Sequence, residues 1–324
     1  MRVVLFTIFM LLTGCASSNS HPDTRSSFTI LSWNISGNAF VSHPSEFKAL
    51  LAFAAPDIVL LDEVDPSTNA AQLRTALPPR QSGRNQSTED IAWHISFGTS
   101  GGRQRGVIAS REPLEELQEF AGGVPYPENA RRQIVQRMPA TDRDRLAASM
   151  DMGIAVNAAI VATRGHRLLV VIADLECCGD DPASWAELKR RLEAKEIRRL
   201  IRRVTERTSV DGIVVAGDFN LVSTAIPLAL MTGPYDTPDS GLIAAELYHR
   251  DGETTWTWDG RGTPFPSRAL DFQVYSPDTL GVAEGTIVDT EDLTVELLEL
   301  HRLEADWSNT LSNHRPLVVQ YSWR

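Results

Sequence analysis

The feature that most constrains how this chain can fold is the stretch Gly-Ile-Val-Val-Ala-Gly-Asp-Phe-Asn at residues 212–220. Its β-branched apolar run predicts a short buried strand. Because side chains alternate faces along an extended chain, Asp218 and Asn220 are expected to point the same way, with Phe219 in the core. An isolated Gly-Asp is more often a turn. A carboxylate and a carboxamide together at a strand end suit polar chemistry on an anionic substrate.

Other apolar runs are bounded by polar side chains in the same way. Four runs end in them and two later runs begin with them. These side chains are Asn34, Glu63, Asp174, Asp218 and Asn220 at the ends, and Asp271, Asn313 and His314 at the beginnings. If the last two strands run antiparallel to the first four, all of these groups gather at one edge of the sheets. Loops and strand ends on a rigid scaffold commonly form active sites.

The remaining pattern predicts strands alternating with amphipathic helices. Strands are expected over residues 28–34, 58–61, 91–97, 107–110, 154–163, 167–173, 269–275 and 317–323. Helices are expected over residues 44–55, 67–77 and 181–207. Asp181 would cap the last helix, with Pro182 in its first position. Residues 111–150 predict loops and short helices, and residues 28–324 show no internal linker that would divide them.

Basic residues are frequent on the helix expected over residues 181–207, but acidic residues alternate with them. This arrangement favours a solvated outer face over a nucleic-acid patch. The whole chain carries a net charge of −11, which argues against extended binding of nucleic acid by a broad basic surface. A local positive cleft remains compatible with that charge.

The N-terminus predicts a targeting segment. Arg2 precedes an apolar run over residues 3–12, which is too short to span a bilayer and suits the core of a signal peptide. Leu12-Thr13-Gly14-Cys15 resembles the signal of bacterial lipoproteins. On this interpretation residues 1–15 are a signal peptide ending at Cys15, which carries the lipid, and residues 16–27 are a polar tether. A plain secretory signal is the alternative. Either way the domain at residues 28–324 would work outside the cytoplasm, at a periplasmic or cell-surface membrane face.

Two further motifs leave alternatives open. Cys177 and Cys178 are adjacent, a spacing that suits zinc poorly. In an oxidising compartment they could form a vicinal disulfide, pair between chains or stay as buried thiols. Gly98-Thr-Ser-Gly-Gly102 matches the nucleophile elbow of serine hydrolases, which would make Ser100 a nucleophile. An elbow needs a strand followed by a helix, whereas a second strand is expected here, so a hairpin is favoured.

Five motifs together resemble those of the endonuclease/exonuclease/phosphatase superfamily, which has the DNase I-like fold. In order they are Trp33-Asn34, Leu61-Asp62-Glu63-Val64, Gly217-Asp218-Phe219-Asn220, Leu270-Asp271-Phe272 and Ser312-Asn313-His314-Arg315-Pro316. The resemblance covers about residues 28–324. It implies an α+β fold, with two mixed β-sheets forming a sandwich and helices on the outer faces.

The resemblance also implies hydrolysis of a phosphate ester with Mg²⁺ or Mn²⁺ as the cofactor. Glu63, Asn34 and Asn313 would hold the metal. Asp218 would orient or deprotonate the attacking water. Two further residues would bind the phosphate: Asn220 by a hydrogen bond, and His314 as an imidazolium.

The resemblance also implies roles for two aspartates, Asp271 and Asp174. Asp271 would fix the tautomer and the charge of His314. Asp174 would face the substrate.

Three positions depart from the superfamily pattern. Asn313 stands where an Asp is usual, Asp174 where a His is common, and Asp62 where a Gln is common. The expected site is therefore more acidic than usual, and it could hold a second cation or bind its substrate differently. Asn313 and Asp174 also support an alternative, in which the fold is a weakened, non-catalytic binding module. Further alternatives are a nuclease of the same superfamily and a serine hydrolase. The acidity of the chain favours a small phosphoester or phospholipid headgroup over duplex DNA.

Overall fold

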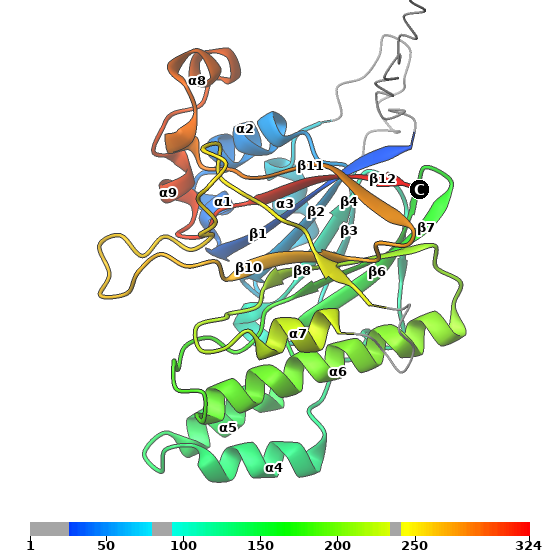
Figure 1. Ribbon diagram of the computed structural model, residues 1–324, viewed down its shortest axis with the longest axis vertical. Helices are drawn as coiled ribbons and strands as arrows, with labels where there is room; N and C mark the ends of the chain where they lie inside the picture. The colour runs from blue at the N-terminus through cyan, green and yellow to red at the C-terminus, as the bar shows by residue number, and fades with distance from the viewer. Residues whose placement is uncertain (1–25, 80–92, 234–240) are drawn as a thin grey trace, which may run out of the picture.

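The computed structural model describes residues 26–79, 93–233 and 241–324. Within these residues the chain forms two six-stranded mixed β-sheets and nine α-helices. The sheets face each other, and the helices cover their outer sides (Figure 1). The predicted sandwich of two mixed sheets is thus confirmed. The expected signal peptide and nearly all of the expected tether, residues 1–25, lie outside the described residues.

The first sheet has the strand order β11-β12-β1-β2-β4-β3. Its strands are β11 (Leu280–Ile287), β12 (Leu317–Trp323), β1 (Ser27–Gly37), β2 (Ile58–Val64), β4 (Val107–Ser110) and β3 (His94–Phe97). β1 and β2 run parallel, while β12 is antiparallel to β1. Strand β11 has no counterpart among the strands expected from the sequence, because Gly281 and Gly285 interrupt its apolar alternation.

The second sheet has the strand order β5-β6-β7-β8-β10-β9. Its strands are β5 (Leu114–Glu116), β6 (Val156–Thr163), β7 (His166–Ala173), β8 (Gly212–Asp218), β10 (Asp271–Tyr275) and β9 (Ile243–Ala244). β7 and β8 run parallel, and β10 is antiparallel to β8. The orientations of β10 and β12 are therefore those that bring the polar strand ends to one edge.

Helices pack on the outer side of each sheet. The helices near the first sheet are α1 (Ala39–Ser42), α2 (Pro44–Ala54), α3 (Ala70–Ala76), α8 (Val295–His301) and α9 (Trp307–Leu311). Those near the second are α4 (Glu128–Arg137), α5 (Arg143–Asp151), α6 (Trp185–Arg207) and α7 (Ile226–Thr232). Helices α4 and α5 and strand β5 occupy the region where loops and short helices were expected.

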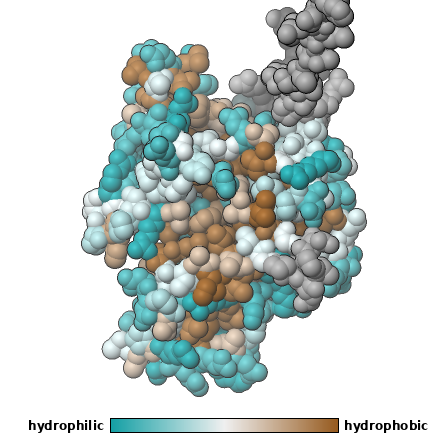
Figure 2. Space-filling view, viewed as in Figure 1, coloured by the Kyte–Doolittle hydropathy of each residue, from teal (hydrophilic) through white to brown (hydrophobic). Residues whose placement is uncertain are grey.

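Three apolar clusters hold these layers together. One lies between the two sheets and includes Ile30, Leu60 and Val214. A second joins the first sheet to α2 and α3, and a third joins the second sheet to α4, α6 and α7. In Figure 2, apolar residues occupy the centre of the face shown, hydrophilic residues cover most of its lower end, and the upper left end is mixed. None of the described helices is both long and apolar enough to cross a membrane.

Helix α6 differs from its prediction in two respects. Its N-cap is Ser184, whose Oγ accepts a hydrogen bond from the Glu187 backbone N–H at 3.1 Å, so Asp181 does not cap it. Asp181 instead accepts a bond from the Ala183 N–H and forms a turn before the helix. The prediction of a wholly solvated charged face is also wrong. Lys189 and Arg190 are buried, because α6 packs against the loop that follows β7.

Candidate active site

The strand ends put their polar side chains into the space between the sheets. On β8, Val214 and Ala216 belong to the cluster between the sheets, so Asp218, two residues further on, also faces inward. The same alternation directs Asp174 inward after β7, since Val170 and Ile172 belong to that cluster. Each apolar strand thus ends in one inward-facing carboxylate.

Strand β2 of the first sheet follows the same rule. Asp62 is in phase with Ile58 and Leu60 of the cluster between the sheets, and it is fully buried. Glu63 would then face the outer helices, but its φ of 53° puts it in the left-handed region. That conformation is uncommon for a residue with a side chain and is often found at functional sites. Glu63 Oε1 instead accepts a hydrogen bond from Asn34 Nδ2 at 3.0 Å.

Asn34 links the two sheets at this edge. Its Nδ2 also lies 3.2 Å from Asp218 Oδ2, while its Oδ1 accepts a bond from the Ser36 N–H at 3.0 Å. The predicted metal residue therefore touches Glu63 and Asp218, but with its amide nitrogen toward them. An oxygen ligand from Asn34 requires the two ends of this amide to exchange places.

Asp218 and Asn220 form a tight turn beyond β8. The Asn220 N–H donates to Asp218 Oδ1 at 2.8 Å, and Asn220 has a φ of 49°. Asn220 Nδ2 donates to the Leu175 carbonyl at 2.8 Å and lies 3.3 Å from Asp174 Oδ1. Asn220 thus ties the end of β8 to the end of β7. It meets a phosphate only if it releases one of these bonds.

His314, which precedes β12, is held by Asp271 at the start of β10. Its Nδ1 lies 2.8 Å from Asp271 Oδ2, and its Nε2 lies 3.8 Å from Asp218 Oδ2. Thr257 Oγ1 donates to the same Asp271 oxygen at 2.6 Å and accepts bonds from the Leu270 and Asp271 N–H groups. Thr257 did not emerge from the sequence, because no motif links it to Asp271.

Two tryptophans, Trp256 and Trp258, flank this threonine in the sequence. The ring of Trp256 packs on His249 and lies next to the guanidinium of Arg315. Trp258 joins the backbone near His314 through an isolated bridge. Among the described residues, therefore, Trp256 has a packing role, and the backbone of Trp258 helps to position His314.

Burial and repulsion between carboxylates raise the pKa values of three carboxyl groups at this edge, those of Asp62, Asp174 and Asp218. Burial, followed by neighbouring carboxylates, holds the pKa of both Asp62 and Asp174 well above the usual range. Burial and Asp271 raise the pKa of Asp218 to about 7. For His314, burial favours the neutral ring, but Asp271 and Asp218 outweigh it and raise the pKa to about 10. His314 is therefore an imidazolium at neutral pH.

The donor set fits a hard divalent cation. Three buried carboxylate oxygens, Asp62 Oδ1, Asp174 Oδ2 and Asp271 Oδ1, have no hydrogen-bond partner within the described ranges. One imidazolium does not balance the carboxylates that surround it, and buried charge without compensation is costly. Oxygen donors of this kind suit Mg²⁺ or Mn²⁺. Glu63 is only partly buried and can present its carboxylate to such an ion.

Asn313, the third predicted metal residue, lies at the exposed rim of this site. Its side-chain oxygen accepts a bond from Ser36 Oγ at 3.0 Å. Ser36 in turn bonds to Asn34, and Asn34 bonds to Glu63, so Asn313 is three contacts away from Glu63. Its neighbour Ser312 donates to the Asn34 carbonyl at 2.7 Å and accepts the His314 N–H at 3.0 Å.

A second His/Asp group, His249 with Asp289 and Asp292, does not fit a metal. His249 Nδ1 lies 2.6 Å from Asp292 Oδ2, and its Nε2 lies 2.8 Å from the Trp256 carbonyl. Both ring nitrogens thus already lie at hydrogen-bond distance from an oxygen of the protein, so neither is available to ligate an ion. Asp289 is occupied by the buried Arg315, whose Nε donates to it at 2.6 Å.

Ser100 lies in a hairpin and has no place in this site. β3 and β4 are antiparallel neighbours, joined through a 3-10 turn at Gly102–Gln104. The Ser100 side chain is buried and accepts a bond from the Val124 N–H at 3.0 Å. The hairpin interpretation is therefore correct, and the elbow interpretation is excluded. Residues 91 and 92 of the expected strand lie outside the described residues.

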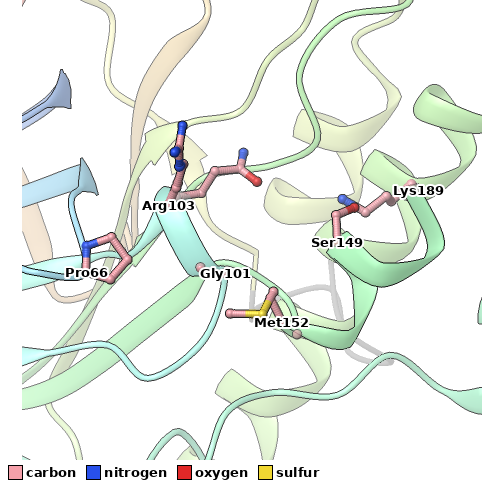
Figure 3. Close-up of a pocket in the computed structure, with 9 residues that line it drawn as sticks. Pro66, Gly101, Arg103, Ser149, Met152 and Lys189 are labelled. Carbon is pink, nitrogen blue, oxygen red and sulfur yellow. The ribbon is translucent and has the colours of Figure 1, made fainter. Parts of the chain in front are cut away.

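A pocket of about 380 Å³ lies beside this hairpin (Figure 3). In that view Arg103 and Pro66 lie on one side, and Ser149 and Lys189 on the other. The side chain of Gln104, which also lines the pocket, reaches the carboxylate of Asp174. The pocket therefore adjoins the Asp174 side of the candidate site. Its lining residues are Pro66, Gly101, Gly102, Arg103, Gln104, Ser149, Met152, Gly153 and Lys189.

Comparison with known protein families shows to which family this chain belongs. The family described as "Endonuclease/Exonuclease/phosphatase family" matches residues 31–314, which is most of the chain. The chain belongs to this family. Members of the endonuclease/exonuclease/phosphatase family are metal-dependent phosphoesterases, and the buried cluster described above occupies the strand ends of that fold. No curated protein matches the chain.

Several solved structures share the fold at low sequence identity. Danio rerio TDP2 complexed with a single-strand DNA product is 15% identical and has a TM-score of 0.52, with 92% of this chain and 99% of that chain covered. The human Nocturnin catalytic domain with bound sulfate is 14% identical, with a TM-score of 0.54 and coverage of 94% and 100%. A family protein from Bacteroides vulgatus is 15% identical, with a TM-score of 0.55 and coverage of 92% and 99%.

The geometry predicts one strong divalent site, at Glu63. Titration of the protein with Mn²⁺ in a calorimeter should show binding that is lost in Glu63→Gln, because the variant removes the accessible carboxylate. Asp292→Asn is the matched control from the second His/Asp group and should bind Mn²⁺ like the wild type. The assignment is wrong if Asp292→Asn loses the ion and Glu63→Gln keeps it.

Proposed function

We propose that this protein hydrolyses a phosphate ester by direct attack of water, with Mg²⁺ or Mn²⁺ as its cofactor. One observation carries the proposal. An imidazolium, His314, is fixed by Asp271 and faces Asp218 across 3.8 Å, next to the accessible carboxylate of Glu63. Hydrolysis of a phosphoester requires a positive hydrogen-bond donor for the phosphoryl oxygens and a base for the attacking water. His314 and Asp218 supply these two groups on either side of the place where the phosphate would bind.

Each residue then has a distinct task. When bound at Glu63 and Asn34, the metal would polarise the phosphate and stabilise the leaving oxygen. Asp218 holds the water and accepts its proton, because burial keeps the pKa of its carboxyl at about 7. His314 donates Nε2–H to a phosphoryl oxygen, while Asp271 and Thr257 keep the ring in place. Asn220 fixes the turn that carries Asp218.

The proposed substrate is a small phosphoester or a phospholipid headgroup. The net charge of −11 disfavours a long nucleic acid, and the pocket of about 380 Å³ suits a single polar group. Because the pocket adjoins Asp174, we place the group attached to the phosphate there. The fold shared with a TDP2 that holds a single-strand DNA product supports the second candidate, a nuclease acting on single strands.

We further propose that the enzyme works outside the cytoplasm, attached to a membrane through a lipid on Cys15. The support is the apolar run followed by Leu12-Thr13-Gly14-Cys15. In a bacterial host, the full-length chain should be recovered with the membranes and Cys15→Ser in the soluble fraction. Equal distribution of the two chains would contradict the anchor.

Activity should depend on both the metal and Asp218. With a panel of phosphomonoesters and phosphodiesters, the wild type should turn over in Mn²⁺ and stop in EDTA. Asp218→Asn should lose about 10³-fold in kcat/KM, since it removes the proton acceptor. Ser100→Ala is the control and should retain the wild-type kcat for each folded molecule. Phosphoester hydrolysis by the wild type that survives EDTA would contradict the role given to the metal.

The same panel separates the enzyme from a binding module. A protein of this fold that has lost catalytic activity would bind Mn²⁺ or a phosphoester without hydrolysing the ester. If none of the substrates is hydrolysed while calorimetry shows binding of a phosphoester, the binding module replaces the enzyme. Asn313→Asp, which restores the usual carboxylate of the family pattern, should then recover measurable turnover only if a missing charge is what weakened the site.

The pocket should control substrate affinity. Ser149→Trp fills it from the exposed end of α5 and should raise KM by about tenfold for esters with a bulky second group. The kcat for an ester with a small leaving group should change little, because the Ser149 hydroxyl donates to the Leu146 carbonyl of its own helix and not to a residue of the candidate site. Ser149→Ala, the matched control, should behave as the wild type. Unchanged KM values in Ser149→Trp would place the substrate elsewhere.

A further inference from the structure

Two adjacent cysteines occupy the loop that leaves the candidate site. Cys177 and Cys178 follow Asp174 and Leu175 beyond β7, and both are exposed. Their Sγ atoms lie 2.8 Å apart. A disulfide of about 2.05 Å therefore requires the sulfurs to approach by less than about 1 Å. Exposure excludes the interpretation that these are two buried structural thiols.

One buried arginine holds the backbone on both sides of Cys177. Arg190 Nε donates to the Glu176 carbonyl at 2.8 Å, and its Nη2 donates to the Cys178 carbonyl at 2.6 Å. Cys178 has a φ of 65°, a left-handed conformation that is unfavourable for a residue with a side chain. The guanidinium is fully buried and paired with Glu187. The two sulfurs are thus kept together by a rigid clamp.

The two thiols are also chemically different. A hydrogen bond from the Cys177 thiol, helped by Arg190, lowers the pKa of Cys178 to about 7. The same hydrogen bond raises the pKa of Cys177. Near neutral pH, Cys178 therefore exists partly as the nucleophilic thiolate, and Cys177 remains a thiol beside it. This is the pairing of an attacking and a resolving cysteine.

We propose that Cys177 and Cys178 are a reversible oxidation site, which closes to an intrachain disulfide on reaction with a small-molecule disulfide. Cys178 attacks one sulfur of the oxidant, forming a mixed disulfide and releasing one thiolate. Cys177 then attacks the Cys178 sulfur, releasing the second thiolate, and its proton passes to solvent or to that thiolate. The chain loses two hydrogens and the oxidant becomes two thiols, so atoms and electrons balance.

The bridge should be easily reduced again. Neighbouring Cα atoms across a trans peptide are about 3.8 Å apart, which is shorter than the roughly 4.4–6.8 Å that disulfides usually span. A bridge between adjacent residues is therefore strained, and strained, exposed disulfides are the labile ones. Such a site responds to the redox state of its surroundings and adds little permanent stability.

The loop is bonded directly to the candidate active site. The Leu175 N–H donates to the Asp218 carbonyl at 2.9 Å, and the Leu175 carbonyl accepts from Asn220 Nδ2 at 2.8 Å. A disulfide between Cys177 and Cys178 would change the conformation of the backbone that Arg190 holds. Cys177 is only two residues beyond Leu175 in the chain. Oxidation is therefore expected to displace Asn220 and Asp174 and to slow hydrolysis. This consequence rests on the proposed function, whereas the oxidation site itself does not.

The first test counts thiols in the full-length chain carrying Cys15→Ser, so that only Cys177 and Cys178 remain. Glutathione disulfide should remove both thiols and lower the mass of the chain by about 2 Da, and dithiothreitol should restore both. In Cys177→Ser, the remaining Cys178 should keep glutathione as a stable mixed disulfide. Two persistent thiols, or disulfide-linked dimers in place of the intrachain bridge, would overturn the oxidation site.

The second test compares initial rates of phosphoester hydrolysis before and after oxidation. The wild type should slow several-fold and recover with dithiothreitol, while the double variant Cys177→Ser/Cys178→Ser should not respond to the oxidant. A bridge that forms without any change in rate would overturn the coupling to the site. Absence of turnover in both redox forms would refute the proposed function, while the thiol count would still decide the oxidation site.

Discussion

The two-residue alternation of side chains along the strands is the constraint on which the site depends. Between the sheets, this alternation places apolar side chains such as Leu60 and Val214 along the strands. At the strand ends, the same alternation puts Asp62 and Asp218 on the face that carries these apolar side chains. The parallel pairs β1–β2 and β7–β8 bring the polar ends of these four strands to one edge of the sheets. A slip of one residue would turn the carboxylates toward the outer helices.

Charge is the second constraint, and it links the fold to chemistry. Several buried carboxylates share this edge with one imidazolium, His314, and three of their oxygens are without partners among the described residues. A divalent cation is the species that balances such a set. The second His/Asp group, around His249, shows the contrast. There both ring nitrogens of His249 and both side-chain oxygens of Asp289 already have partners, so the group stabilises the structure.

Much of this could be predicted from the sequence, because it depends on local patterns. Alternation and β-branched runs located the strands that carry the site, and the polarity of their ends predicted the edge at which they meet. Contacts between distant segments were not predictable. Thr257 reaches Asp271, Arg190 holds the cysteine loop, and Glu63 departs from alternation through its backbone. None of these follows from spacing, since each is decided by packing between elements far apart in the chain.

The departures from the family pattern act together in the structure. Beyond the effect of burial, the carboxylates of Asp218 and Asp62 raise the pKa of Asp174, so two of these departures are linked electrostatically. Asn220 and Leu175 join this acidic side to the oxidisable loop. The same segment therefore connects the proposed substrate pocket, the catalytic turn and the cysteine pair, so a change in any one of them is expected to affect the others.

The most direct test of the account is to follow the oxygen of the attacking water. Hydrolysis in Mn²⁺ and ¹⁸O-labelled water should put the label into the phosphate product, because the water held by Asp218 attacks phosphorus. Label found in the alcohol would show that the carbon–oxygen bond breaks instead. That result would contradict the roles assigned to Asp218 and His314.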